Sequence, residues 1–268
     1  MPKTPISYYG GKINMLKEIL PRIPKHRIYT EAFFGGGAVF FAKEPSEAEI
    51  INDINGMVVN FFEVVKTDFN WLKNQIEATL FARETYSKAW LIYKTPSLVE
   101  DKRLRAWACY VACNMGFANK PGSWGYDKYN KRVKTFRNKT MRFDESIVKR
   151  LEFVQIENND ACKVIESRDT KETFHYVDPP YINTYQGDYC GYTECDYRNL
   201  LDTLSNIKGT FLLSSYPSEI LDEYVAKNGW YSIRFEKSLS ARKVEAGASR
   251  THKKVEVLTA NYPLDKDD

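Results

Sequence analysis

Cysteine and histidine are scarce in this sequence, which limits the kinds of site it can contain. The chain has 268 residues, with five cysteines and three histidines. Neither the pair Cys109 and Cys113 nor the pair Cys190 and Cys195 has the spacing to histidine that tetrahedral zinc sites show. We therefore predict reduced thiols, as in cytosolic proteins, and no bound metal.

Long hydrophobic runs are also missing. No apolar stretch approaches the roughly 20 residues that a membrane-spanning helix needs, and the N-terminus MPKTPISYYGGK lacks the apolar core of a secretory signal. Hydrophobic residues make up 43% of the chain and charged residues 28%, which excludes a wholly disordered protein. The sequence predicts a soluble, cytoplasmic protein without a membrane partner.

Positive charge is concentrated in one window of the chain. The formal net charge is +4, but residues 120–142 carry eight basic side chains and one acid, so this window is +7 and the rest of the chain is −3. Trp124, Tyr126, Tyr129 and Phe136 are interleaved with these charges. Basic residues that alternate with aromatic rings suit a surface that binds phosphates and stacks against bases. A solvated basic loop without a partner is the alternative that this feature leaves open.

Segments typical of strands alternate with segments typical of helices over most of the chain. Strands are expected at 27–31, 48–52, 153–157, 173–178, 210–215, 231–235 and 254–261, with helices at 160–166, 193–207 and 218–228. This alternation predicts an α/β fold with a largely parallel sheet. Residues 71–143 break the rhythm, because helices at 71–93 and 101–113 are followed by a basic loop that contains glycine and proline.

A glycine cluster follows the first expected strand, in the segment EAFFGGGA at 31–38. Glycines between a strand and a helix let a ligand approach the backbone closely, although the pattern is not the GxGxxG of dinucleotide sites. Asp53 ends the next strand, 22 residues after Glu31, where an acid is placed to bind ribose hydroxyls. The alternative for Asp53 is a plain turn residue within the segment NDING.

The sharpest signal is the segment Asp178-Pro179-Pro180-Tyr181, at the end of an apolar strand. Two consecutive prolines stop the hydrogen-bonded ladder and fix an extended bend. Such a bend can direct a carboxylate, a carbonyl and an aromatic ring into the crevice beyond the carboxyl ends of the strands, where open α/β sheets bind ligands. A proline-rich turn capped by aspartate is the alternative for this segment alone.

Taken together, these motifs resemble those of a known enzyme family. The blocks are SYYGGK (7–12), EAFFGGGAVF (31–40), NDIN (52–55), DPPY (178–181) and HKKVEVLTANY (252–262). In this order they resemble Dam-type DNA N6-adenine methyltransferases, and they span nearly the whole chain. The sequence departs from the family pattern at Tyr8, where tryptophan is common, and at Ala32, where proline is common. Its insertion also lacks the longer specificity loop, so GATC is not implied as the recognised site.

The resemblance implies a Rossmann-like methyltransferase fold with two functional parts. Residues 1–67 and 144–268 would form the catalytic domain that binds S-adenosylmethionine and releases S-adenosylhomocysteine. Residues 68–143 would form a mostly helical, basic insertion that recognises the target. By motif, the cofactor-binding residues would be Tyr8, Lys12, Glu31, Phe33, Gly35, Asp53, Asp160 and Asp178. The residues acting on the target base would be Asp178, Pro179 and Tyr181.

The chemistry of an exocyclic amine is consistent with these residue types. The lone pair of such an amine is delocalised into the ring, so acceptors at the Asp178 carboxylate and the Pro179 carbonyl would favour a more tetrahedral nitrogen that attacks the sulfonium methyl directly. Tyr181 would stack on an adenine flipped out of the duplex. The segment 182–195, with Tyr185, Tyr189 and Tyr192, is either a lid over this pocket or simple packing.

The partner expected from the resemblance is double-stranded DNA. Phosphate contacts dominate such interfaces, and the candidates are Lys120, Lys128, Lys131, Arg132, Lys134 and Arg137. We expect a monomer, and a restriction endonuclease counterpart is left open. Two alternatives are retained: an enzyme that methylates RNA adenine or the N4 amine of cytosine, and an inactive nucleic-acid-binding protein with a methyltransferase-like domain.

Overall fold

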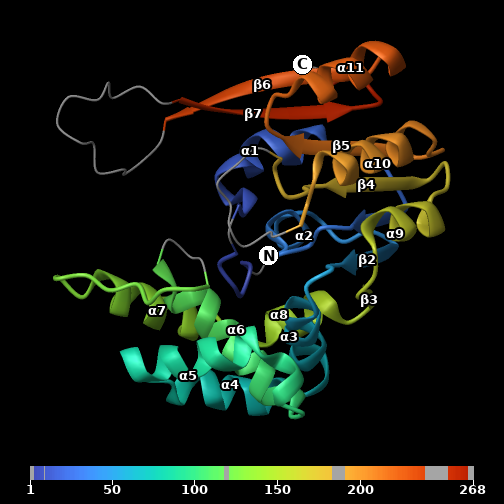
Figure 1. Cartoon of the computed structure of the whole chain (residues 1–268). Coiled ribbons are helices and arrows are strands. Elements are labelled where there is room, and N and C mark those ends of the chain that lie inside the picture. The colour runs from blue at the N-terminus through green and yellow to red at the C-terminus, as the bar shows by residue number, and fades with distance from the viewer. Residues whose placement is uncertain (1–2, 9, 118–120, 183–190, 239–252, 265–268) are drawn as a thin grey trace, which may run out of the picture. The chain divides into compact units, whose positions relative to one another are not determined.

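The computed structural model describes residues 3–8, 10–117, 121–182, 191–238 and 253–264. Contacts between residues group the chain into two compact units, which are described separately. Unit 1 comprises residues 1–20 and 33–160, and unit 2 comprises residues 21–32 and 161–268 (Figure 1). Each unit therefore contains parts of the chain that lie far apart in the sequence.

The strands form a mixed sheet of seven strands with helices on both sides. They are β1 (Ile28–Glu31), β2 (Ala48–Asn52), β3 (Val154–Glu157), β4 (Thr173–Val177), β5 (Thr210–Ser215), β6 (Tyr231–Ser238) and β7 (Lys253–Ala260). Their order is β3-β2-β1-β4-β5-β7-β6. The pairs β2–β3, β1–β4 and β4–β5 are parallel, whereas β7 is antiparallel to both β5 and β6. The prediction of an α/β fold with a largely parallel sheet is confirmed.

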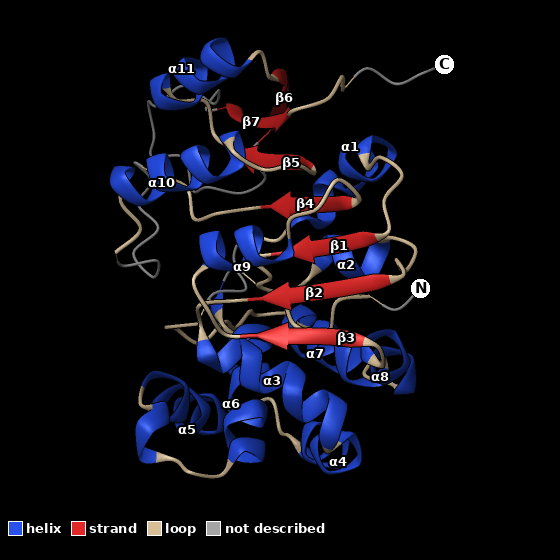
Figure 2. Ribbon diagram, turned by 90° about the vertical axis from the view of Figure 1, so that its right-hand side faces the viewer, coloured by secondary structure: helices blue, strands red, loops and turns tan. Residues whose placement is uncertain are grey.

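Unit 2 contains the centre of this sheet. Every residue of β4 is buried, as expected for a parallel strand covered on both faces. Figure 2 shows β1, β4 and β5 side by side, with their arrowheads at the same edge. The helices of this unit are α9 (Ala161–Arg168), α10 (Glu194–Ser205) and α11 (Glu219–Asn228), and α10 packs between the other two. Thr193 and Asp196 form a capping box at the start of α10.

Unit 1 contains strands β2 and β3 and most of the helices. These are α1 (Leu16–Ile19), α2 (Ala38–Ala42), α3 (Gly56–Thr67), α4 (Phe69–Ala78), α5 (Arg83–Lys94), α6 (Lys102–Met115), α7 (Lys131–Met141) and α8 (Glu145–Leu151). Short 3-10 turns occur at Lys12–Met15, Leu20–Arg22 and Pro96–Leu98. The core is aromatic: the ring of Phe34 meets that of Phe62 edge to face at 4.8 Å between centroids, and α3 packs on α6. Aromatic residues make up 14% of the chain, and this packing accounts for part of them.

The expected helix at 71–93 is wrong as a single element, because the chain breaks it into α4 and α5. The break at Thr79–Ala82 follows a tertiary contact: the indole Nε1–H of Trp107 on α6 donates to Thr79 Oγ1 at 2.8 Å. Both α4 and α5 pack on α6, whereas one straight helix over 71–93 could not contact α6 along its whole length. No glycine or proline marks the break in the sequence, so local signals could not reveal it.

The expected basic loop is also wrong for its second half, which forms α7. Pro121, Gly122 and Gly125 all precede residue 126, whereas Lys131–Met141 contains neither glycine nor proline. Phe136 and Thr140 are buried, four residues apart, on one side of this helix. The helix is hard to predict because its buried side is short and its other positions are mostly charged or polar.

Candidate functional site

The carboxyl ends of β1 and β4 are neighbours in unit 2. The chain continues from β1 toward β2 on one side and from β4 toward β5 on the other, so the strand order reverses at this pair. The register pairs Glu31 with Tyr176, and Asp178 therefore follows directly beyond the paired residues. Ligands of open α/β sheets bind at such a reversal, outside the carboxyl ends of the strands.

Tyr181 is held by its hydroxyl group. The hydroxyl donates to Glu256 Oε2 at 2.8 Å, and it lies 3.5 Å from Asp178 Oδ1 and 3.4 Å from Ser214 Oγ. Burial and the nearby charges of Asp178 and Glu256 raise the pKa of Tyr181 well above its ordinary value, so the hydroxyl keeps its proton. The ring centroid of Tyr216 lies 4.2 Å from that of Tyr181, with the planes tilted by 52°.

A small cavity of about 50 Å³ lies beside this segment, entirely within unit 2. Its lining consists of prolines, aromatic rings and two serines: Pro179, Pro180, Tyr181, Ile182, Tyr197, Ser215, Tyr216, Pro217 and Ser218. The structure therefore brings the segment that follows β4 together with the one that follows β5. The cavity is far smaller than the roughly 300–1,000 Å³ of ordinary small-molecule sites, so it marks where these two segments meet.

Glu31 occupies the last position of β1, where it is buried with an exposed fraction of 3%. Its Oε2 accepts a hydrogen bond from the hydroxyl of Tyr29 at 2.7 Å. The charges of Asp178, Glu31 and Glu256 also act on Tyr176, whose pKa is raised mainly by burial. Three carboxylates thus surround one aromatic residue at this edge of unit 2.

The glycine turn in unit 1 lies against the ring of Tyr8. Gly35 has φ +50°, and a Cβ built there would lie 2.8 Å from Tyr8 Cδ1. A side chain at this position would therefore meet both a strained backbone and a ring. The N-terminal block and the glycine block, which are separate in the sequence, are packed together within this unit.

Asp53 is the buried carboxylate of unit 1 and lies directly after β2. Its Oδ2 accepts from the Gly35 N–H at 2.7 Å, and its Oδ1 accepts from the Asn55 N–H at 2.8 Å. Burial raises the pKa of Asp53 to about 6, although both N–H donors lower it. Because an ionised carboxylate can accept about four hydrogen bonds, the group has capacity for two further donors, such as vicinal hydroxyls.

Asn55 connects three segments of unit 1 through its side chain. Its Nδ2 donates to the hydroxyls of Tyr8 at 3.1 Å and Tyr93 at 2.9 Å, and its Oδ1 accepts from the Met57 N–H at the start of α3. Tyr93 belongs to α5, so this one side chain links the turn after β2 to the helical region. The block NDIN contained the residue, but the sequence offered no signal for its partners.

The turn after β3 supports the turn after β2. The Asn52 side chain exchanges two hydrogen bonds with the backbone of Asn159, and Asn158 Nδ2 donates to the Asp53 carbonyl at 2.7 Å. Asp160 follows these residues and is exposed. Since β2 and β3 are parallel neighbours, their carboxyl ends place Asp53 and Asp160 at the same edge of unit 1.

Two further residues of the cofactor set also belong to unit 1. Lys12 is buried, and its Nζ donates to the Gly10 carbonyl at 3.0 Å. Phe33 follows β1 and precedes the glycines, half-buried. Of the residues expected to bind the cofactor, the structure thus groups Tyr8, Gly35 and Asp53 by direct contact in unit 1.

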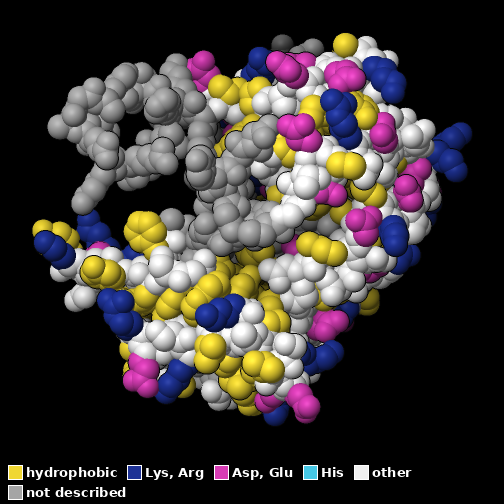
Figure 3. Space-filling view, viewed as in Figure 1, with side chains coloured by type: hydrophobic (Ala, Val, Ile, Leu, Met, Phe, Trp, Pro, Cys, Tyr) yellow, Lys and Arg dark blue, Asp and Glu magenta, His cyan; other side chains and the backbone are white. Residues whose placement is uncertain are grey.

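The basic window separates into two kinds of residue. Lys128, Lys131, Lys134 and Arg137 are exposed, whereas the guanidinium of Arg132 donates to the Gly116 carbonyl. Figure 3 shows Lys and Arg side chains beside hydrophobic ones on the helical part of unit 1. The exposed apolar residues here include Phe117, Tyr126 and Tyr129. Lys120, and residues 183–190 of the expected lid at 182–195, lie outside the described residues.

Lys139 also belongs to this window but turns inward. Its Nζ donates to Asn114 Oδ1 at 3.0 Å and to Ser7 Oγ. Burial, with a smaller contribution from the charge of Arg132, lowers the pKa of Lys139 to about 8. This lysine ties α7 to the segment that carries Tyr8 and is not a surface charge.

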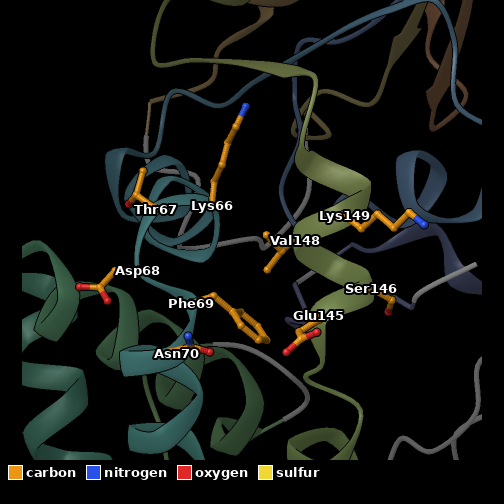
Figure 4. A pocket seen from close by; sticks show the side chains of 9 residues that line it. All are labelled: Lys66, Thr67, Asp68, Phe69, Asn70, Glu145, Ser146, Val148 and Lys149. Atoms are coloured by element: carbon orange, nitrogen blue, oxygen red, sulfur yellow. The ribbon is translucent and has the colours of Figure 1, made fainter.

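A larger hollow of about 640 Å³ lies elsewhere in unit 1 (Figure 4). It is lined by the junction of α3 and α4 and by α8, through Lys66, Thr67, Asp68, Phe69, Asn70, Glu145, Ser146, Val148 and Lys149. None of the residues predicted from motifs lines it. Its charged groups are of both signs and do not converge on one point (Figure 4).

The structure places no obvious metal site in the part of the chain that it describes. No group of three or more His, Cys, Asp or Glu side chains there could hold an ion. Within the same residues, no helix is long and apolar enough to cross a membrane. Among the described cysteines, Cys109, Cys113, Cys162 and Cys195 form no disulfide bond with one another.

Comparison with known proteins gives a consistent family. The chain is 25% identical over 276 residues to the Type II methyltransferase M1.LlaDCHI of Lactococcus lactis subsp. cremoris, covering 94% of this chain and 93% of the relative. It is 23% identical to a DNA adenine methylase of Vibrio cholerae, covering 74% of each. The solved structure of a precorrin 8W decarboxylase from Methanobacterium thermoautotrophicum aligns at 10% identity over 97% of this chain and 98% of that one. Its TM-score is 0.40, and no argument rests on it.

The family model for D12 class N6 adenine-specific DNA methyltransferases matches residues 8–243. This match runs from Tyr8 of the N-terminal block through the glycine turn and the DPPY segment, and it includes the basic window. The chain therefore belongs to the D12 class of N6 adenine-specific DNA methyltransferases.

Proposed function

We propose that this protein transfers a methyl group from S-adenosylmethionine to the N6 amine of an adenine flipped out of duplex DNA. The observation that carries the proposal is the position of Asp178, Pro179 and Tyr181, directly after the buried strand β4 and beside the end of β1. A carboxylate, a carbonyl and an aromatic ring there are the groups that an exocyclic amine on a planar base requires.

The residues of unit 1 are suited to the nucleoside part of the cofactor. The buried Asp53 has capacity for two hydroxyl donors, and its bond to the Gly35 N–H places it beside the glycine turn and the ring of Tyr8. We assign Tyr8, Lys12, Phe33, Gly35, Asp53 and Asp160 to the cofactor, together with Glu31 and Asp178 of unit 2. When bound, S-adenosylmethionine supplies a methyl group on a positively charged sulfur.

The Asp178 carboxylate and the Pro179 carbonyl would accept the two amino hydrogens of the base. Hydrogen bonds to these two acceptors would favour a tetrahedral nitrogen, whose lone pair could then attack the methyl group. The rate gain would therefore come from positioning and fixed dipoles. Tyr181 stacks on the base and offsets part of the few kcal/mol that flipping costs. No covalent bond between protein and base is required.

Residues 68–143 are proposed as the target-recognition insertion, with residues 1–67 and 144–268 as the catalytic domain. The exposed Lys128, Lys131, Lys134 and Arg137 would contact phosphates. Arg132 would support that surface through its bond to Gly116. The monomeric state and a restriction endonuclease counterpart stay predictions from the sequence.

The first experiment identifies the modified nucleoside. The protein is incubated with labelled S-adenosylmethionine and unmethylated genomic DNA, which is then digested to nucleosides. We expect label in N6-methyladenine, and sequencing of the modified positions would give the target site. Label in N4-methylcytosine, or in RNA alone, would instead support the alternative substrates. Absence of cofactor binding in a calorimetric titration would support the inactive binding protein.

The Asp178→Ala variant tests the site itself. Because the carboxylate acts on the reacting amine, turnover should fall by about 10²–10³, the usual effect of removing one preorganised group. DNA affinity in a filter-binding titration should change little. Asp222→Ala, which removes an exposed carboxylate on α11, is the matched control and should keep normal turnover. Near-normal turnover of Asp178→Ala would refute the assignment.

A further inference from the structure

Strand β7 contains an acid where its neighbours are apolar. Glu256 lies between Val255 and Val257, and its exposed fraction is 8%. Its backbone pairs with Phe235 of β6, whereas the pairing of β7 with β5 ends one residue away at Val257, so Glu256 lies just beyond the carboxyl end of β5. Burying a carboxylate costs several kcal/mol unless hydrogen bonds compensate it. An apolar residue would serve the core better, which suggests another role.

Strand register explains where Glu256 points. Tyr176 is paired with Leu212, and Ser214 is paired with Leu258. Side chains two residues apart on a strand share a face, so Tyr176, Ser214 and Glu256 all lie on one face of β4, β5 and β7. Asp178 follows Tyr176 by two residues at the end of that face. The DPPY segment and Glu256 are thereby brought together, although Tyr181 and Glu256 are 75 residues apart.

The hydroxyl of Tyr181 has one proton, and three oxygen atoms of described residues lie near it. Glu256 Oε2, at 2.8 Å, is well inside hydrogen-bonding distance, whereas Ser214 Oγ at 3.4 Å and Asp178 Oδ1 at 3.5 Å are at its limit. The proton is therefore donated to Glu256. This bond fixes the far end of the Tyr181 side chain, while the ring of Tyr216 contacts its side.

We propose that Glu256 is a positioning residue for Tyr181. By accepting the hydroxyl proton, Glu256 holds the ring in the orientation that stacks on the target base. It also draws that proton away from Asp178, whose carboxylate must accept from the amine. Glu256 touches neither cofactor nor base in this scheme and acts only through the tyrosine. The inference rests on the proposed methyl transfer and adds a residue to it.

The test is a double-mutant cycle in the full-length enzyme, with kcat and the KM for S-adenosylmethionine as readouts. Glu256→Ala and Tyr181→Phe should each lower kcat about tenfold, the effect of losing one hydrogen bond to a charged group, and leave this KM unchanged. The double variant should be no slower than either single one. Glu256→Gln keeps an acceptor oxygen and should restore most of the rate.

Three results would overturn the inference. They are a full rate in Tyr181→Phe, rate losses that multiply in the double variant, and a Glu256→Gln rate as low as that of Glu256→Ala. If Glu256→Ala does not fold, as judged by thermal unfolding, the cycle is run with Glu256→Leu, which fills the space. Glu223→Ala on α11 is the matched control and should keep the normal rate.

The proposed function fails in a different way. Wild-type protein that transfers no methyl group would overturn both proposals together. Active wild-type protein with rate losses that multiply would overturn the role of Glu256 alone and leave Asp178 unaffected.

Discussion

Asp53 shows how burial and hydrogen bonding compete at one residue. Removal from water raises the pKa of this carboxyl to about 6, and the N–H groups of Gly35 and Asn55 lower it only in part. Near neutral pH the carboxyl group of Asp53 is therefore largely ionised, and in mild acid it becomes protonated. A carboxylate with this pKa binds hydroxyl donors well only in its ionised form.

Cofactor affinity should therefore depend on pH around this pKa. The Kd for S-adenosylmethionine, measured by calorimetry, should be constant above pH 7 and rise up to about tenfold per unit below pH 6. Asp53→Asn cannot ionise, so its Kd should be higher and independent of pH over the same range. A wild-type Kd that does not change between pH 5 and 7 would remove Asp53 from the cofactor site.

Glycine and proline carry local information, which is why residues such as Gly35 and Pro179 could be singled out from the sequence. The requirement of Gly35 for a positive φ is a property of the backbone at that position. The role of Asn55, in contrast, depends on three separate segments of the chain, because its side chain donates to the hydroxyls of Tyr8 and Tyr93. Only the structure could identify that second kind of residue.

Helix α7 has one buried side and one exposed side. Its buried side carries Phe136 and Thr140, and its exposed basic residues Lys131, Lys134 and Arg137 lie three residues apart. Residues at this spacing remain on neighbouring sides of a helix. Arg132 and Lys139 instead point toward Gly116, Ser7 and Asn114. Burial thus divides one basic window into an exposed set and a set that makes internal contacts.

Neutralising the exposed set should make DNA binding less sensitive to salt. In the triple variant Lys131→Ala, Lys134→Ala, Arg137→Ala, the slope of log K against log salt should decrease in magnitude by about 0.9 for each phosphate that is no longer neutralised, or up to about three in all. The matched control replaces Lys171, Lys208 and Lys227, which are exposed elsewhere on unit 2. An unchanged slope in the triple variant would count against a phosphate-binding role for α7.

At the scale of the whole molecule, two buried groups affect acid stability in opposite directions. His175 is fully buried, its Nδ1 lies 2.7 Å from Thr30 Oγ1, and burial lowers its pKa from 6.5 to about 4. The unfolded chain therefore binds this proton first, and stability is lost as pH falls from 6.5 to 4. Asp53 has a pKa raised from 3.8 to about 6, so its contribution to stability is lost as pH rises through that range.

Variants should separate the contributions of Asp53 and His175 to the free energy of unfolding. Each is on the order of 3 kcal/mol, because each pKa is shifted by more than two units and one unit corresponds to about 1.4 kcal/mol. Relative to the wild type, Asp53→Asn should gain unfolding free energy progressively between pH 4 and 6. His175→Gln should gain it progressively as pH falls from 6.5 to 4. Urea unfolding at several pH values measures both differences, and Glu166→Gln, at an exposed position of α9, is a surface control. Differences that do not vary with pH would contradict these assignments.

Much of the architecture follows from patterns that act over a few residues. Segments of five to eight residues typical of strands located the sheet: 48–52 and 210–215 have the observed boundaries, and the ends of the others differ by up to three residues. The break at Thr79 and helix α7 were missed because each depends on contacts with α6 or with the core beneath. Element type is mainly local, whereas interruption of an element is decided by what it packs against.

Sequence alone determined the α/β class, the turns after β1, β2 and β4, and the family, because each depends on local backbone requirements or on motif order. Tertiary structure alone decided which side chains share those turns. Glu256 meets Tyr181 because strand register aligns one face of β4, β5 and β7, and Arg132 turns from the basic surface because a carbonyl lies within its reach. Such contacts join residues far apart in the chain, and no local pattern encodes them.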